Sequence, residues 1–552
     1  MVALTSLLLL VGTVAAHNGQ HNGGSPSYSK PGYNRPTQGP SRPWKSKEPW
    51  KGQPPWKTSS RSSSLPATAP SSSYKPTGTA TLPLVNSEEL QASISESALS
   101  DLAHELEDIA FSTDESNRVM GSLGHNRTID WITSQFDELK GYFTYEVQPF
   151  AALYSHAEGN LTVNDVDQNG VPFEYTAGGD VAGEIVMVED FGCEASNYPA
   201  NVDGKIALIS RGTCEFGLKS ALAGAAGATG AIIYNNAPGE IGGGTLGEPP
   251  RPEGPYVPTI GISQERGVAI ADSIEAGETV SAGLLVDAET YNITTYNVIA
   301  QTIGGDDSQV LTMGAHSDSV YAGPGINDDG SGTVALLEVA RQLTKYRTNN
   351  AVRFCFWSGE EFGLLGSTYY VSQLSNASRA QIPIYLNFDM IASPNYIYAI
   401  FDGDGSEFNI TGPPGSAEGE AFFQDYFTQQ GLNYTATAFD GRSDYGPFID
   451  VGIAAAGLFT GAEEEKTEEW AQQFGGTAGE SLDPNYHDAG DNYDNLNFEA
   501  FVVNTKAIAA AVAEYGTSFG SLNQASLQRK RSPWKRTVRN YKIRCHHKIW
   551  KS

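Results

Sequence analysis

The chain has 552 residues, a formal net charge of −29 at pH 7 and only four cysteines. This length exceeds what one hydrophobic core supports, so we expect two folded domains together with extended segments. Four cysteines are too few for disulfides to hold so large a protein together. The negative charge excludes nucleic acid as a partner, because it repels phosphates, and it favours cationic ligands.

The N-terminal residues have the pattern of a secretory signal. Residues 1–16 form a short apolar run with small residues at Val14 and Ala16, which predicts a signal peptide cleaved before His17. The run is shorter than the ~20 residues of a membrane-spanning helix, and we expect no membrane span later in the chain. We therefore expect an extracellular protein, with the vacuolar lumen as the alternative.

Six glycosylation sequons agree with passage through a secretory pathway. The sequon asparagines are Asn126, Asn160, Asn292, Asn376, Asn409 and Asn433.

Both ends of the chain are basic and low in aliphatic residues. Residues 17–82 are rich in Ser, Pro and Lys, so we expect disorder there. Within them a Pro-Trp-Lys motif repeats at Pro43, Pro49 and Pro55. A glycosylated, extended linker is the favoured interpretation, and a polysaccharide-binding repeat is the alternative. The basic tail, residues 521–552, is expected to be a disordered appendage.

The folded part begins near Pro83 with two predicted helices. Apolar residues recur at helical spacing over 88–111 and again over 128–142. Residues 150–290 change character, with short Val- and Ile-rich strands separated by Gly and acidic residues. This composition predicts a smaller, separate lobe.

From residue 291 the pattern alternates between strand and helix. Apolar strands such as QVLTMGAH, AVRFCFW and IPIYLNF enclose the helical segment GTVALLEVARQLTKY. Such alternation predicts an α/β domain with a mostly parallel central sheet flanked by helices. We expect residues 83–149 and 291–520 to form this domain and residues 150–290 to be inserted in it.

The inserted lobe contains a recognisable sequence. Its run RGTCEFGLKSALAGAAGATGAIIYNN, with Gly212, Cys214 and Phe216 in a Gly-x-Cys-x-Phe pattern, resembles the protease-associated domain. The resemblance implies a role in substrate gating or stability and not in catalysis.

Cys193 and Cys214 both lie in polar, Gly-containing segments and are the expected disulfide, whereas Cys355 lies within an apolar strand and should be free. Cys545 has no assigned role.

Polar clusters follow three of the predicted strands, in QVLTMGAHSD, VRFCFWSGEE and PIYLNFDM. In a parallel sheet these strand ends meet at one edge, where ligands bind. Hard carboxylates together with neutral imidazoles suit zinc, and five such ligands exceed what one tetrahedral zinc needs. We therefore expect two metal ions, about 3.5–4 Å apart, that share a bridging carboxylate.

Several motifs resemble one peptidase family in sequence and in order. They are GAHSDSV, GINDDGSG, WSGEEFGLLGS, NFDMI, FDGRSDYGPF, LFTGAEEEKT and NYHDAGDN. The chain from about Pro83 to Gly520 resembles the zinc aminopeptidase family that includes aminopeptidase Y and the secreted fungal leucine aminopeptidases. The resemblance implies a monomer with two Zn²⁺ ions that hydrolyses leucine and other apolar residues from peptides with a free N-terminus.

The resemblance also implies a zinc ligand set. His316 and Asp389 would hold one zinc, Glu361 and His487 the other, and Asp328 would bridge them. Relatives of this kind retain a cis peptide bond at the position that joins Asp328 to Asp329 here.

The remaining implied roles belong to residues that do not bind the metals. Glu360 would be the general base for the attacking water. Asp318 would orient the His316 imidazole. Tyr486 would stabilise the oxyanion and Arg442 would contact the substrate backbone.

Other interpretations remain beside this one. Carboxypeptidase-like and glutaminyl-cyclase-like relatives share the metal arrangement, and a metal-free receptor or adhesion glycoprotein could retain the fold.

Two other sequences resemble metal-binding motifs only in part. The HELED sequence at His104 has Asp108 where a zinc-binding HExxH motif requires histidine. The DGDGSE sequence at Asp402 has Glu407 where a calcium loop requires glycine, so we expect a turn there.

Overall fold

The computed structural model describes residues 81–236, 239, 241 and 244–522. The predicted signal peptide, nearly all of the Pro-Trp-Lys segment, Cys545 and the basic tail after residue 522 lie outside these residues. Within the described part, no helix has the length and apolar character needed to cross a membrane.

The N-terminal region folds into three helices, α1 (Ser87–Ala92), α2 (Glu96–Phe111) and α3 (Leu123–Glu138). Each begins at a polar cap whose side chain accepts a backbone N–H of the first turn, as Ser95 does for α2 and Ser122 for α3. Their apolar faces are buried in the main core. The helix predicted over 88–111 is divided into α1 and α2 by the caps at Ser93 and Ser95, and α3 begins five residues before the predicted 128 and ends four before the predicted 142.

The centre of the larger domain is a parallel group of four strands, in the order β14-β11-β9-β10. Their bounds are β9 (Asp306–His316), β10 (Asn350–Trp357), β11 (Ile384–Phe388) and β14 (Ala454–Phe459). At one edge β12 (Ala399–Phe401) pairs antiparallel with β14 and parallel with β13 (Thr435–Thr437). At the other edge β8 (Ser281–Thr302) pairs antiparallel with β10. The predicted α/β sheet is therefore confirmed, with antiparallel pairs outside its parallel centre.

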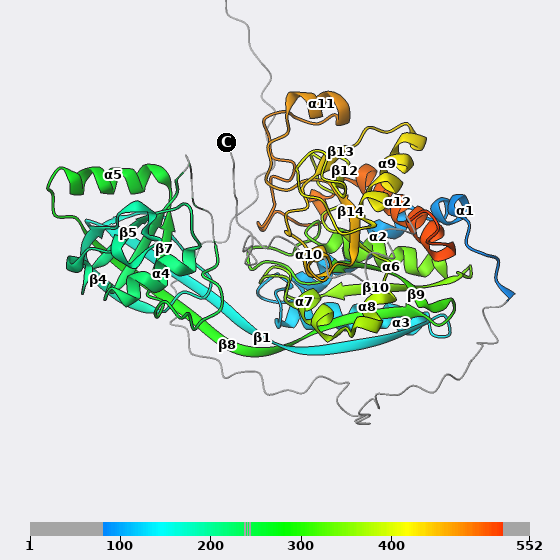
Figure 1. Cartoon of the computed structure of the whole chain (residues 1–552), viewed down its shortest axis with the longest axis horizontal. Coiled ribbons are helices and arrows are strands. Elements are labelled where there is room, and N and C mark those ends of the chain that lie inside the picture. The colour runs from blue at the N-terminus through cyan, green and yellow to red at the C-terminus, as the bar shows by residue number, and fades with distance from the viewer. Residues whose placement is uncertain (1–80, 237–238, 240, 242–243, 523–552) are drawn as a thin grey trace, which may run out of the picture. The chain divides into compact units, whose positions relative to one another are not determined.

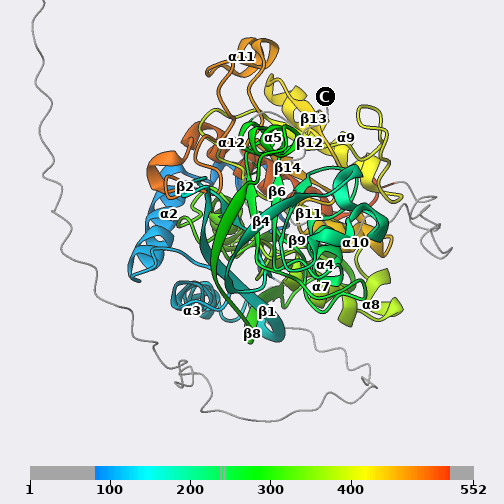
Figure 2. The same ribbon diagram turned by 90° about the vertical axis from the view of Figure 1, so that its left-hand side faces the viewer.

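Helices cover both faces of this sheet because its side chains alternate between two cores. Phe354 and Phe356 of β10 pack in the core shared with α2, α6 (Gly330–Leu343), α9 (Ser416–Gln430) and α12 (Phe498–Thr517). Their neighbours Cys355 and Trp357 pack in the other core, against α7 (Leu365–Gln373) and α10 (Tyr445–Asp450). Figure 2 shows α2 and α3 on the opposite side of the strands from α7 and α10.

The inserted lobe is joined to this sheet by two long strands. β1 (Phe143–Val163) pairs antiparallel with β8 along its whole length, and the hydrogen-bonded ribbon continues into the lobe (Figure 1). In the lobe, β4 (Gly179–Met187) pairs with β8, and β5 (Ile206–Ser210), β6 (Gly230–Tyr234) and β7 (Thr259–Ile262) follow in parallel.

The other elements of the described chain are short or peripheral. They are β2 (Val166–Asp167), β3 (Val171–Pro172), α4 (Phe216–Ala225), α5 (Gln264–Glu275), α8 (Asn376–Ala380), α11 (Glu468–Phe474) and 3-10 turns at Asp190–Gly192, Ala195–Asn197, Ala200–Val202 and Tyr493–Asn495.

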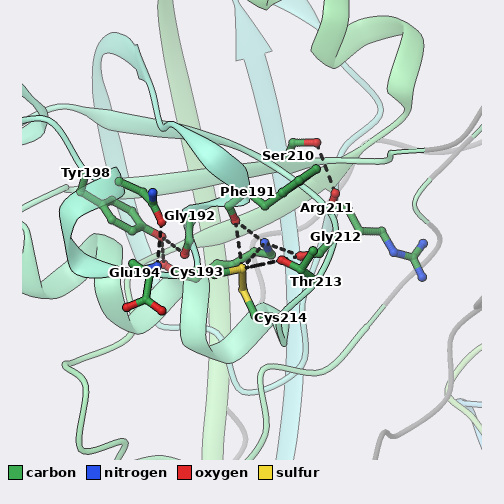
Figure 3. Close-up of a disulfide and its surroundings, with 12 residues drawn as sticks. Phe191, Gly192, Cys193, Glu194, Tyr198, Ser210, Arg211, Gly212, Thr213 and Cys214 are labelled. Carbon is green, nitrogen blue, oxygen red and sulfur yellow. Dashed lines mark hydrogen bonds between the residues drawn. A yellow bond between two sulfur atoms is a disulfide. The ribbon is translucent and has the colours of Figure 1, made fainter.

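A disulfide joins Cys193 to Cys214 in the lobe, as predicted (Figure 3), and Cys355 is free and buried in β10. Next to the disulfide, the buried Lys219 ammonium donates hydrogen bonds to the carbonyl oxygens of Phe191 and, at 3.0 Å, of Gly212. Burial lowers the pKa of Lys219 to about 8. The disulfide and this lysine together tie the 190–193 turn to the 212–214 turn.

Candidate metal centre

Three adjacent strands deliver polar side chains to one edge of the sheet. His316 is the last residue of β9 and pairs in register with Trp357, the last residue of β10, after which Glu360 and Glu361 follow. Asp389 comes directly after β11 on the other side of β9. Parallel pairing therefore brings together groups that are up to 73 positions apart in the sequence, the distance from His316 to Asp389.

Asp328 lies between two imidazoles. Its Oδ1 is 3.0 Å from His316 Nε2, and its Oδ2 is 3.2 Å from His487 Nε2. His316 Nε2 is also 3.7 Å from Asp389 Oδ1, and His487 Nε2 is 3.0 Å from Glu361 Oε2. The five residues thus form two groups of three that share Asp328.

The electrostatics of the cluster depend on burial and on ion pairing. Burial alone would lower the pKa of His487, but the Glu361 and Asp328 carboxylates outweigh it and raise that pKa to about 10. Burial raises the pKa of Asp389 to about 6. Hydrogen bonds from His316 and His487 overcome burial at Asp328 and hold its pKa below the ordinary range. Burial also lowers the pKa of His316, but Asp318 and Asp328 outweigh it and raise that pKa well above its ordinary value. Without a metal, the two imidazoles would therefore offset part of the carboxylate charge, which a bound cation would otherwise do.

The donor set fits a divalent metal ion. It combines buried carboxylates with imidazoles, which are ligands that zinc accepts. Among the described residues, Glu361 Oε1 is buried and has no hydrogen-bond partner, although buried polar atoms are normally paired. A metal ion would satisfy this oxygen.

Asp318 contacts both His316 and Glu360. Its Oδ1 accepts a hydrogen bond of 3.3 Å from the Glu360 backbone N–H and lies 3.7 Å from His316 Nδ1. The Asp318 backbone oxygen is closer to His316 Nδ1, at 3.2 Å. The imidazole is therefore oriented by the main chain of Asp318 as well as by its carboxylate.

Sequence reasoning did not identify two further buried aspartates. Asp329 accepts backbone N–H groups of His316, Gly332 and Met390, so it joins β9, the start of α6 and the segment after β11. Asp491 accepts the N–H groups of Asn327 and Asp328. Asp329 has a recognisable signal, an aspartate at a helix N-cap before Gly-Ser-Gly. Asp491 has none, because its partners are distant in sequence.

The structure has a cis peptide bond between Asp328 and Asp329, as the family resemblance implies.

A cavity of about 250 Å³ opens beside these residues. One part of its wall is polar and is formed by Asp328, Glu360, Glu361, Asp389, Arg442, Tyr486 and His487. The other part is apolar and is formed by Met390, Ile397, Phe401, Phe459, Trp470 and Leu482, among others. The cavity can therefore receive a polar reacting group and one apolar side chain together.

Arg442 and Tyr486, both predicted site residues, line this cavity. The Arg442 guanidinium donates hydrogen bonds of 3.0 and 3.3 Å to the two carboxylate oxygens of Glu463. The Tyr486 ring stacks on the His487 imidazole with 3.9 Å between ring centres. Ser443, next to Arg442, donates to Asp389 Oδ2 at 2.5 Å.

The acidic loop at Asp402 is a turn, as predicted. Asp402, Asp404 and Glu420 lie close together. The Asp402 carboxylate, however, accepts backbone N–H groups of the turn, including those of Gly405 and Phe408. These hydrogen bonds account for its burial without a cation.

Five of the six sequon asparagines are exposed, whereas Asn126 is partly buried in α3, where its amide donates to the Ser122 carbonyl at 2.8 Å. The exposed five are Asn160, Asn292, Asn376, Asn409 and Asn433.

Family models match both parts of the chain. Residues 297–512 match peptidase family M28, and residues 159–270 match the PA domain. "Probable leucine aminopeptidase 2" of Aspergillus fumigatus is 50% identical over 422 residues, covering 76% of this chain and 83% of the relative. Leucine aminopeptidase 2 of Arthroderma otae is 48% identical over 439 residues, with coverages of 79% and 87%.

Solved structures show the same fold. An aminopeptidase from Aneurinibacillus superposes with a TM-score of 0.63 at 28% identity, covering 77% of this chain and 95% of its own. The zinc aminopeptidase BSAP of Bacillus subtilis superposes with a TM-score of 0.58 at 25% identity, covering 78% and 96%.

Proposed function

The chain belongs to peptidase family M28, and on that premise we propose that it is a two-zinc aminopeptidase that releases leucine and other apolar residues from the free N-terminus of peptides. Its relatives are named leucine aminopeptidases, and the name of BSAP identifies it as a zinc enzyme. The observation that carries the proposal is the position of Asp328, whose two oxygens face different imidazoles.

The chain's own residues divide between the two metal positions. His316 and Asp389 would hold one zinc, Glu361 and His487 the other, and Asp328 would contact both. Bound zinc supplies a Lewis acid that polarises the scissile carbonyl and acidifies water. The described cavity wall offers little other positive charge, because His487 would bind zinc as a neutral imidazole and Arg442 is already paired with Glu463.

Glu360 is the proposed proton carrier. It lines the cavity next to Glu361, and burial raises the pKa of its carboxyl well above the ordinary value. A carboxylate with a raised pKa is a stronger base for the proton of water. Bound zinc ions nearby would favour the ionised form of Glu360, which is the form that can accept this proton. Glu360 takes the proton of the attacking water and delivers it to the nitrogen of the leaving peptide.

Tyr486 and Arg442 act on the substrate itself. The Tyr486 hydroxyl would donate to the carbonyl oxygen as negative charge develops there. Arg442, fixed by Glu463, would contact the substrate backbone. Glu360 and Asp389, which line the same cavity, would attract the free α-ammonium group.

The cavity favours an aminopeptidase over the related carboxypeptidases. A carboxypeptidase must bind a terminal carboxylate, which requires an available cation. Among the described residues that line the cavity, Arg442 is the one lysine or arginine, and its guanidinium is bound to a carboxylate. The apolar wall would accept one aliphatic side chain at the terminus.

Two measurements test the proposed activity. Zinc analysis of the purified protein should give two ions per chain, and aminoacyl substrates should be hydrolysed with leucine among the best. The matched control is the same substrate with an acetylated amine. Equal hydrolysis of free and acetylated substrates, or full activity without metal, would disprove the proposal.

We further propose a secreted, glycosylated monomer whose catalytic domain comprises residues 83–149 and 291–520, interrupted by a protease-associated domain at 150–290. The match of residues 159–270 to the PA domain supports the insertion. N-terminal sequencing and glycopeptide mapping of protein from the culture medium, together with light scattering, test these statements.

A further inference from the structure

Arg118 is a completely buried arginine in the turn between α2 and α3. Its guanidinium donates three hydrogen bonds to carbonyl oxygens: Nε to Pro324 at 2.8 Å, Nη2 to Gly325 at 2.5 Å, and Nη1 to Ser317. All three acceptors lie in residues 317–325, which we name the ligand loop because it connects His316 to the segment that carries Asp328. An arginine is rarely buried without such compensation.

The backbone beside Arg118 is joined to the same loop. The Arg118 N–H donates to Ser319 Oγ at 2.9 Å, and the Ser319 N–H donates to the Arg118 carbonyl at 3.3 Å. The Asn117 side-chain amide donates to the Tyr321 carbonyl at 3.1 Å. Residues 117–118 therefore follow the ligand loop along much of its length.

The close approach requires a glycine in the loop. Gly325 has a φ of +63°, and a Cβ at this position would come within 3.1 Å of Arg118 Nη2 and 2.4 Å of the Asp328 carbonyl oxygen. A side chain at this position would collide with the Asp328 carbonyl oxygen and, at 2.7 Å, with Ser319 Cβ, and it would crowd the guanidinium, so the loop requires glycine here. The loop and Arg118 are thus fitted to each other directly before Asp328.

The charge of Arg118 and its hydrogen bonds should have opposite effects on metal binding. Burial lowers its pKa, whereas the nearby Asp318, Asp491, Asp329 and Asp328 raise it, and an arginine remains charged in any case. Its three side-chain hydrogen bonds go to carbonyls, so it leaves the carboxylate oxygens to other partners. A fixed positive charge near the cluster should oppose cation binding, whereas a fixed loop geometry should promote it.

We propose that Arg118 is a positioning residue for the metal centre, and that the planar fork of its guanidinium holds the ligand loop so that His316 and Asp328 are presented in the geometry the metal ions need. The proposal rests on the two-zinc site proposed above. It predicts that fork geometry, and not positive charge, is the property of Arg118 that matters.

Zinc affinity of the R118K and R118M proteins separates the two properties. Lysine keeps the charge but cannot donate to three carbonyls in a fixed plane, and methionine keeps neither property. Residues that orient metal ligands typically contribute 10- to 100-fold to metal affinity. We therefore expect zinc binding to weaken on the order of 10- to 100-fold in both variants, measured by chelator competition on the metal-free protein.

The control is R353K. Arg353 on β10 also uses its fork, donating to Gln301 Oε1 through Nε and Nη2 and to the Tyr370 hydroxyl, but not to the ligand loop. The zinc affinity of R353K should stay within about 2-fold of that of the unmodified protein, because the residues that orient the metal ligands are unchanged.

Three outcomes would overturn the proposal. These are unchanged zinc affinity in a folded R118K protein, unchanged affinity in R118M, or tighter binding in R118M, since the last result would show that charge dominates. If neither variant folds, N117A removes the single side-chain hydrogen bond from Asn117 to the same loop. Wild-type zinc affinity in folded N117A would then overturn the proposal. An unmodified protein that binds no zinc would instead disprove the proposed function.

Discussion

The carboxylate of Asp318 accepts a hydrogen bond from the backbone N–H of Glu360, at 3.3 Å. The same oxygen lies 3.7 Å from His316 Nδ1. One buried group therefore contacts the residue proposed as general base and a residue proposed as zinc ligand. The loops after β9 and β10 are fixed relative to each other at the point where the reaction would occur.

Replacement of Glu360 by glutamine should lower turnover steeply without removing zinc. General-base catalysis contributes roughly 10²- to 10⁴-fold, so kcat should fall by at least that factor with a small change in KM. The proposed ligands His316, Asp328, Glu361, Asp389 and His487 are unchanged in E360Q. Steady-state kinetics together with zinc analysis of the same sample check this prediction.

E361Q is the matched comparison, because it makes the same chemical change one residue away. Glu361 Oε2 lies 3.0 Å from His487 Nε2, in the proposed second metal position. This variant should lose zinc together with activity. If E360Q loses zinc, or E361Q retains both ions, the two roles have been assigned wrongly.

Asp318→Asn should weaken both functions that Asp318 supports. The amide oxygen can still accept from Glu360 N–H, but the charge beside His316 is lost. We expect zinc affinity to fall by about 10- to 100-fold, as for other residues that orient ligands, and kcat to fall at saturating zinc. D307N is the control, because Asp307 is exposed near the start of β9, the strand that Asp318 follows. Wild-type zinc affinity in D318N would contradict this role.

The polar clusters at the strand ends could be predicted from sequence because each follows an apolar strand directly. His316 and Asp389 are placed by the parallel pairing that the strand–helix alternation implies. The Cys193–Cys214 disulfide was also predictable, since the other cysteine of the folded region, Cys355, lies in an apolar strand.

The supporting residues could not be predicted in the same way. Arg118 and Asp491 each bind the segment around Asp328 from more than 160 positions away in the sequence. No local pattern marks such a contact, because it depends on how α2, α3 and the chain before α12 pack on the sheet. The expected boundaries at 150 and 290 fall inside β1 and β8, since two continuous strands enter the lobe without a turn.

Glu463→Gln should impair substrate binding through Arg442. Glu463 accepts from Arg442 Nη2 with both oxygens, and its side chain is largely buried. The variant loses the charge that holds the guanidinium, so we expect KM to rise severalfold with a smaller change in kcat. A larger rise is expected in R442M. Glu465 is exposed, so E465Q provides the same charge change two residues away and should behave as wild type.

A fall in kcat at unchanged KM in E463Q would contradict this assignment, because it would place Arg442 in the chemical step and not in binding.

Removal of zinc should make the stability of the protein strongly dependent on pH. In the metal-free protein the Glu361 and Asp328 carboxylates raise the pKa of His487 to about 10, against 6.5 for an ordinary histidine. The folded state then binds a proton that the unfolded chain releases, so this stabilisation is fully present below about pH 6.5 and is lost as the pH rises through about 10. Asp389, whose pKa burial raises to about 6, acts in the same direction at lower pH.

Zinc replaces these protons, so the zinc-loaded protein should show a much flatter dependence between pH 6.5 and 10. Urea unfolding of chelator-treated and zinc-loaded samples at several pH values in this range gives both curves. H487Q is the internal control, because without this imidazole the metal-free protein should lose the His487 share of the dependence above pH 6.5 and keep the share of His316, whose pKa is also raised. Metal-free wild-type protein that becomes more stable from pH 7 to 9 would show that the carboxylates, and not His487, carry the charge balance of the empty site.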